Sequence, residues 1–183
     1  DTDDDGDGLS DSEESIAGTN SLSADTDSDG MNDLFEVNNN LDPNLDDASL
    51  DTDGDGLDNL GEYQANSDPN KDDVPPALTP PADVQVTSTG VLTEASVGVA
   101  DAEDVKDGEV TASASNSGPF PIGTTSVIWT ASDLAGNEST ATQTVTVIPF
   151  VETLSVGRVA EGSSFELKAV MNGEASSYPI DIP

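Results

Sequence analysis

The chain has 183 residues and a formal net charge of −34, from 38 acidic and four basic side chains. This balance argues against nucleic acid or an anionic membrane as a partner, because binding to either requires Lys and Arg. The chain contains no Cys and no His, so disulfides, thiol nucleophiles and the commonest general base are excluded. No apolar run approaches the roughly 20 residues of a membrane-spanning helix, and we expect no direct insertion into a membrane.

The negative charge is concentrated in the first part of the chain. Residues 1–73 contain 24 acidic residues and one Lys, whereas residues 74–183 contain 14 acidic and three basic residues. The first segment therefore either stays unfolded or folds around cations. The second is rich in Thr, Val, Ala and Gly, which is typical of β-structure. Because the chain begins at Asp1 rather than Met, we expect a mature or excised fragment of a secreted protein.

An acidic twelve-residue loop occurs three times, beginning at Asp3, Asp25 and Asp51. Each copy has Asp at positions 1, 3 and 5, Gly at position 6, Asp or Asn at position 9, and Glu at position 12. Calcium takes about six to eight oxygen ligands, and side chains at alternate positions of a tight loop converge on one centre. Gly at position 6 permits the sharp turn, and a backbone carbonyl at position 7 adds a further ligand.

The sequence therefore predicts at least three bound calcium ions (Ca2+), one in each loop. The predicted ligands are Asp3, Asp5, Asp7, Leu9, Asp11 and Glu14 in the first loop, Asp25, Asp27, Asp29, Met31, Asp33 and Glu36 in the second, and Asp51, Asp53, Asp55, Leu57, Asn59 and Glu62 in the third. Three copies in one register argue against a merely solvated acidic linker.

An EF-hand explains these loops poorly, because it requires a helix on each side of the loop. Only two residues precede Asp3, and the apolar residue occupies position 7 rather than the usual position 8. Residues 1–73 instead resemble the thrombospondin type 3 repeat in its bacterial form. This resemblance implies short loops wound around calcium with almost no hydrophobic core, which often serve as stalks or spacers.

Each copy also has an Asx residue seventeen positions after its first Asp, namely Asn20, Asp42 and Asp68. Two interpretations remain open: a contact for further ions between repeats, or turn formation. Short helical turns are expected near residues 12–17, 34–37 and 59–64. The few apolar contacts are expected from Ile16, Phe35, Val37, Leu60 and Tyr63.

Residues 74–81 contain four Pro residues and are expected to form a stiff joint. Beyond this joint, alternation of period two predicts five short strands. They are expected around residues 84–86, 97–99, 110–114, 125–131 and 145–147. Short strands at such spacing, separated by turn-rich stretches, favour a β-sandwich over residues 82–148.

Residues 77–148 resemble a hyalin repeat (HYR) domain. The resemblance is carried by the runs GPFPIGTT at 118–125, VIWTASD at 127–133, AGN at 135–137 and TQTVTV at 142–147. It implies an immunoglobulin-like fold used in extracellular adhesion or as a spacer, with no catalytic residues. Trp129 is then expected in the core, and a carbohydrate platform is the alternative. Asp101, Asp104 and Asp107 either hold one more calcium ion or are solvated.

Residues 149–183 are expected to contain strands near 165–171 and 178–182, which are too few to form a sandwich. Two interpretations remain open: an incomplete β-domain, or strands exchanged with another subunit.

We expect a non-catalytic, secreted or cell-surface calcium-binding module of structural or adhesive function, of bacterial origin. Its partners are calcium and other protein subunits or cell-surface components. The alternatives are a filament subunit joined by strand exchange and the spacer region of a secreted hydrolase. Catalysis by carboxylate pairs is disfavoured, because the Asp residues fall on the calcium pattern.

Overall fold

The structure, a computed structural model, describes residues 2–151, 164–171 and 174–181. Contacts between residues divide the chain into two units. Unit 1 comprises the chain up to Ala77 together with Glu103–Val110 and Ser132–Glu138. Unit 2 comprises Leu78–Ala102, Thr111–Ala131 and the chain from Ser139 onward. Two loops that lie within the sequence of the β-domain therefore pack with the acidic repeats.

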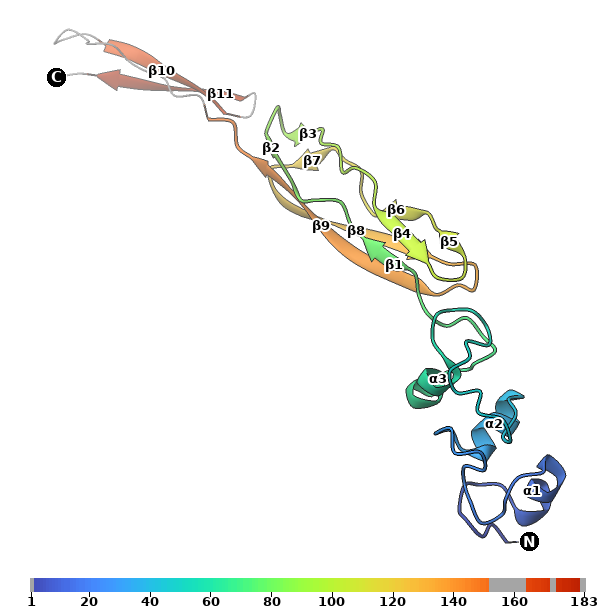
Figure 1. Ribbon diagram of the computed structural model, residues 1–183. Helices are drawn as coiled ribbons and strands as arrows, with labels where there is room; N and C mark the ends of the chain where they lie inside the picture. The colour runs from blue at the N-terminus through green and yellow to red at the C-terminus, as the bar shows by residue number, and fades with distance from the viewer. Residues whose placement is uncertain (1, 152–163, 172–173, 182–183) are drawn as a thin grey trace. The chain divides into compact units, whose positions relative to one another are not determined.

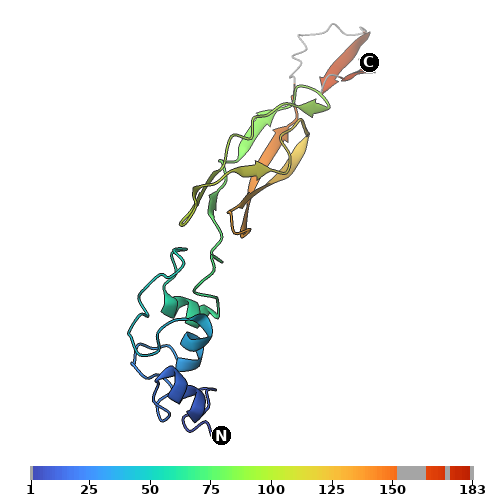
Figure 2. The ribbon, with the colours of Figure 1, turned by 90° about the vertical axis from the view of Figure 1, so that its right-hand side faces the viewer.

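Each acidic loop in unit 1 runs into one short helix, as expected (Figure 1, Figure 2). The helices are α1 (Asp11–Ala17), α2 (Asp33–Asn39) and α3 (Asn59–Ala65). Each begins at loop position 9, and the residue at position 8 caps its N-terminus. Asn32 Oδ1 accepts a hydrogen bond of 2.9 Å from Phe35 N in this way. Capping explains why position 8 is polar here rather than apolar.

Acidic residues make up most of the interior of the repeats, and apolar residues contribute little to it. Its buried apolar side chains include Leu9, Met31 and Ala48, and Pro43 and Pro69 are buried as well. The rings of Phe35 and Tyr63 meet edge to face with centroids 5.0 Å apart, in line with the expected contact. The expectation for Ile16 and Val37 is wrong: both are exposed, and Ile16 is 87% exposed, because the helices turn their acidic faces inward.

The β-domain is built from short strands in several sheets (Figure 1). A four-stranded sheet has the order β2-β9-β8-β6, with β2 and β9 parallel and β6 and β8 antiparallel. A three-stranded sheet has the order β1-β4-β5, and β3 pairs with β7. The strands are β1 Ala77–Thr79, β2 Val84–Thr87, β3 Leu92–Thr93, β4 Asp101–Asp104, β5 Gly108–Glu109, β6 Ala112–Ala114, β7 Phe120–Pro121, β8 Gly123–Ser132 and β9 Glu138–Ile148.

Four of the five expected strand regions contain strands. The segment 97–99 does not, and that expectation is wrong. Val97 is buried whereas Val99 is 86% exposed, so the two side chains do not share a face. Gly98 lies between them at φ +79°, a conformation that interrupts the alternation of an extended strand. Strand β1, in turn, forms within the segment expected to be only a joint.

The core of the β-domain surrounds Trp129, which is 4% exposed. Its Nε1 donates a hydrogen bond of 3.1 Å to Gln143 Oε1. Gln143 Nε2 donates in turn to the carbonyl oxygens of Ala82 and Val97. The core position expected for Trp129 is confirmed, because a buried indole presents no face for a carbohydrate. The apolar cluster consists of Val97, Ala100, Phe120, Val127, Trp129, Val145 and Val147.

Strands β10 (Ser164–Met171) and β11 (Glu174–Asp181) pair antiparallel, with Ser164 opposite Asp181. Both expected C-terminal strands are therefore present, although Ile182 lies outside the described residues. The pairing of these two strands with each other is compatible with an incomplete β-domain and with strands that exchange with another subunit. An incomplete domain and exchanged strands both stay predictions.

Candidate metal centres

The Asp at position 1 winds each acidic loop around its own carboxylate. Asp25 Oδ1 accepts a hydrogen bond of 2.7 Å from Ser28 N, and its Oδ2 accepts one of 3.1 Å from Gly30 N. The first and third loops repeat both bonds. Position 4 has a left-handed backbone in every loop, with φ of +83° at Gly6, +69° at Ser28 and +86° at Gly54. The sequence pattern therefore specifies a tight ring of backbone around carboxylate groups.

Positions 3 and 12 bring unpartnered oxygens into the same rings. One oxygen of the Asp at position 3 and both oxygens of the Glu at position 12 are buried, and no described group hydrogen-bonds to them. The three Glu side chains are 0% exposed. The residues concerned are Asp5, Glu14, Asp27, Glu36, Asp53 and Glu62. Burying a charged carboxylate without a partner is strongly unfavourable, so these oxygens indicate a cation.

The pKa values of the buried Glu carboxyl groups are raised, because burial and neighbouring negative charges disfavour their charged form. Burial raises the pKa of Glu36 to about 8, and repulsion from Asp29 and Asp27 adds to the effect. Burial likewise raises the pKa of Glu62 to about 7 and raises that of Glu14. A cation among these groups opposes both causes, because it favours the charged form of each carboxyl group.

Within every loop, carboxylate oxygens of positions 1, 3 and 5 lie within 4.8 Å of one another. A donor set made only of oxygens suits a hard cation, and the residues present fit calcium. The structure thus brings together the side chains predicted at these three positions: Asp3, Asp5 and Asp7, then Asp25, Asp27 and Asp29, then Asp51, Asp53 and Asp55.

Two further carboxylate groups extend beyond the loops. Asp29 and Glu36 meet Asp47, and Asp55 and Glu62 meet Asp73, again with oxygens within 4.8 Å. Sequence reasoning missed Asp47 and Asp73. The signal was present, however, because position 23 counted from the first Asp of each copy is Asp25, Asp47 or Asp73.

The residues at position 9, which were predicted as ligands, accept hydrogen bonds from the residue at position 2 of the same loop. Asp33 Oδ1 accepts a hydrogen bond of 2.8 Å from Thr26 N, and Asp33 Oδ2 accepts one of 2.7 Å from Thr26 Oγ1. Asp11 accepts from Asp4 N, and Asn59 accepts from the hydroxyl of position 2 in its loop. Direct ligation at position 9 stays a prediction, as does ligation by the carbonyls of Leu9, Met31 and Leu57.

The three Asx residues that follow the loops form turns. Each Oδ1 accepts a hydrogen bond from the amide nitrogen two residues further on, at 3.1 to 3.3 Å. Each backbone carbonyl also accepts from the amide three residues further on. These bonds favour the turn interpretation of Asn20, Asp42 and Asp68, which are all exposed.

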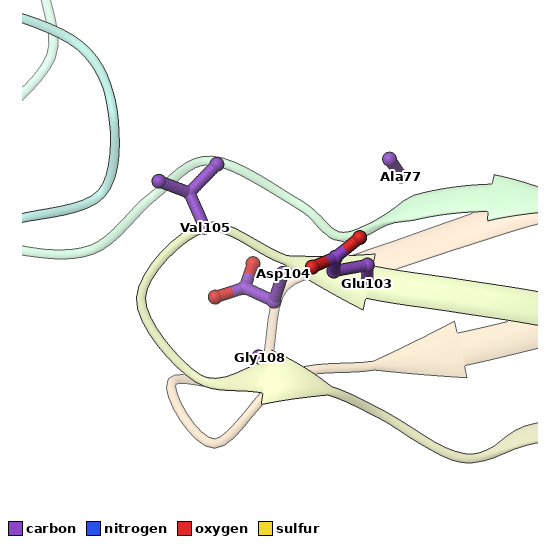
Figure 3. Close-up of a pocket in the computed structure, with 5 residues that line it drawn as sticks. All are labelled: Ala77, Glu103, Asp104, Val105 and Gly108. Carbon is purple, nitrogen blue, oxygen red and sulfur yellow. The ribbon is translucent and has the colours of Figure 1, made fainter.

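The acidic residues near β4 have local roles in the structure. Asp104 Oδ1 accepts from the amides of Lys106 and Asp107, and Asp107 Oδ2 accepts from Leu134 N. A shallow pocket lies beside this turn, lined by Ala77, Glu103, Asp104, Val105 and Gly108 (Figure 3). With only two acidic side chains on its wall, the pocket offers a poor match to a metal centre.

The fold and the loops together define a class of protein: an array of acidic cation-binding loops joined to a β-domain of immunoglobulin-like type. Residues 3–24 and 51–71 match the bacterial TSP3 repeat, which is a calcium-binding repeat, and residues 71–147 match the HYR domain. Both family resemblances, and their order along the chain, are confirmed. Comparison with curated proteins gives no match. No described helix is long and apolar enough to cross a membrane.

Proposed function

We propose that the chain is a non-catalytic extracellular module in which calcium folds an array of repeats that carries an immunoglobulin-like β-domain. The observation that supports this most strongly is the buried, unpartnered Glu at position 12 of each loop. The two matched families support an extracellular structural or adhesive role. A secreted or cell-surface location in a bacterium is part of the proposal.

The mechanism is electrostatic. Without a cation, the clustered carboxylates of each loop repel one another and lose solvation on burial. Positions 1, 3, 5 and 12 of each loop would hold calcium, with the position 7 carbonyl completing the shell. Calcium supplies the positive charge that offsets this repulsion. Binding free energy thereby becomes folding free energy for a segment that has almost no apolar core.

The proposed stoichiometry is at least three ions. The carboxylate groups that contain Asp47 and Asp73 provide oxygens for more than three ions. Glu36 and Glu62, which belong to these groups, each have two oxygens without a hydrogen-bond partner. Isothermal titration of the full chain in calcium tests this count directly. We expect three or more ions for the native chain and fewer for Glu36→Gln. A count below three in the native chain contradicts the proposal.

A structural role, rather than a catalytic one, is supported by the use of the acidic residues. The carboxylates predicted as ligands accept hydrogen bonds from backbone amides of their own loop, as Asp25 and Asp33 do, or lie in the carboxylate clusters that could hold a cation. The filament subunit and the hydrolase spacer remain alternatives at the level of the whole protein. Strands β10 and β11 are the part of the described chain that would serve strand exchange.

A further inference from the structure

Neighbouring repeats contact each other where a glycine of one loop meets a leucine side chain of the next repeat. A Cβ placed on Gly8, at position 6 of the first loop, would lie 2.7 Å from Leu34 Cδ2. A Cβ placed on Gly30, at position 6 of the second loop, would lie 3.4 Å from Leu60 Cδ1. Both leucines occupy position 10 of the following copy. The glycine of one loop therefore receives the leucine of the next repeat.

The third loop has no following copy in the chain, yet its glycine is covered in the same way. A Cβ placed on Gly56 would lie 3.0 Å from Val105 Cγ1 and 3.3 Å from Val105 Cγ2. Val105 lies in the turn between β4 and β5, which belongs to unit 1 (Figure 3). This turn of the β-domain thus supplies the apolar side chain that a fourth repeat would supply.

A second similarity involves an asparagine that binds an Asp near the end of the preceding repeat, at position 23 of the second repeat and at position 22 of the third. Asn59 Nδ2, from the third loop, donates to Asp47 O at 3.0 Å and to Asp47 Oδ1 at 3.3 Å. Asn137 Nδ2, from the turn between β8 and β9, donates to Asp72 O at 3.1 Å and to Asp72 Oδ1 at 3.4 Å. Asp133 fixes Asn137 in this turn by accepting from both its backbone and its side-chain nitrogen. Both asparagines clasp the end of the preceding repeat.

We propose that the β4–β5 and β8–β9 turns take the place of a fourth repeat, so that calcium in the third loop stabilises the β-domain. This proposal rests on the proposed calcium binding. Asp55 links the Gly56 contact to the Asn137 contact. It belongs to two carboxylate groups of the third repeat, and its Oδ2 accepts a hydrogen bond of 3.2 Å from Asp73 N. An ion that orders this loop also orders Gly56 and the segment that Asn137 clasps. A ligand that binds only the ordered state stabilises everything that folds with it.

Trp129 provides the reporter, since it is the chain's only Trp and lies on β8, which ends at the turn that carries Asn137. Thermal unfolding of the full chain is followed by Trp129 fluorescence, in millimolar calcium and in chelator. We expect calcium to raise the midpoint of this transition by roughly 4–8 °C. Asp53→Asn, which alters the third loop alone, is expected to remove the rise.

Val105 provides the specific variant. Val105→Ser is expected to reduce the calcium-dependent rise while isothermal titration still counts the native number of ions. Val105→Leu, which restores the residue found in the repeats, is expected to keep the rise. Val99→Ser is the matched control, because Val99 is also exposed in the β-domain but lies in unit 2. Val105 is itself 69% exposed, so its loss does not open the core.

The outcomes separate the two proposals. If titration counts three or more ions but the Trp129 midpoint is the same with and without calcium, the coupling is wrong and the proposed function stands. A rise that persists in Asp53→Asn or in Val105→Ser also overturns the coupling. If no calcium binds, both proposals fail together.

Discussion

Asp73 N donates a hydrogen bond of 3.2 Å to Asp55 Oδ2, which binds the end of the third repeat to the middle of its own calcium loop. Asp29 Oδ2 accepts from Asp47 N in the same way, at 3.2 Å. The other oxygen of each position 5 Asp accepts from the amide of position 7. Position 5 therefore joins the loop to the segment that follows it.

Asp29 belongs to two carboxylate groups of the second repeat, one with Asp25 and Asp27 and one with Glu36 and Asp47. Asp29→Asn is therefore expected to lower the number of bound calcium ions more than Asp27→Asn does. Isothermal titration of both variants measures the difference, with Glu94→Gln as an exposed acidic control in unit 2. Equal losses in the Asp29 and Asp27 variants argue against a second ion group that shares Asp29.

Asp27→Ala and Asp58→Ala test the register of the loops. Asp27 has a buried, unpartnered oxygen, so its removal is expected to abolish an ion and unfold the middle loop. Asp58 is exposed and caps α3 by accepting from Gly61 N at 2.8 Å. Asp58→Ala is expected to keep every ion and lose about 1 kcal/mol of helix stability. Loss of an ion in Asp58→Ala, by titration, would show that the register is displaced.

Ser28 holds a left-handed backbone that its side chain disfavours, at φ +69°. Ser28→Gly is expected to stabilise the calcium-loaded second repeat by about 1 kcal/mol, because glycine removes this strain. The reciprocal change Gly54→Ser places the same strain in the third loop, where no described atom lies within 4 Å of the added Cβ. It is expected to destabilise by a similar amount. Denaturant unfolding in calcium that moves both variants in the same direction contradicts this account.

The metal-free repeats are expected to lose stability as the pH rises. The pKa of Glu36 is raised from 4.5 to about 8 in the folded state, so the folded chain binds more protons than the unfolded chain between these values. Stability present at about pH 5 therefore declines toward about pH 8. Protease resistance of residues 1–73 in chelator, followed across this pH range, measures the trend, because any protection left without calcium is expected near pH 5 and is lost toward pH 8. Glu36→Gln should flatten it. Stability that increases over this range contradicts the assigned burial of Glu36.

The loop repeats could be predicted from sequence because their ligands follow a fixed local spacing. Asp25, Asp27 and Asp29 converge within one tight ring, so spacing alone places them together. Asp47 was missed because its approach to Glu36 depends on the path of the chain between them. The exposure of Val99 was missed because alternation assumes an extended backbone, which Gly98 interrupts.

The packing of Val105 on Gly56 could not be predicted from the sequence either. The repeat pattern pairs a glycine with a leucine ten positions into the next copy, and no spacing rule extends that pairing into a β-turn. Trp129 was placed correctly in the core by the HYR resemblance, and the regular alternation of its strand, β8, agrees with that placement.

Limited proteolysis of the full chain, with millimolar calcium or with chelator, tests most directly whether calcium folds residues 1–73. Extracellular calcium sites bind at roughly 10⁻⁴ to 10⁻³ M, so millimolar calcium should load the loops. We predict that residues 1–73 resist cleavage in calcium and are cut rapidly in chelator, while fragments that retain the Trp129 core persist longer. Equal resistance of residues 1–73 in both conditions would contradict the account.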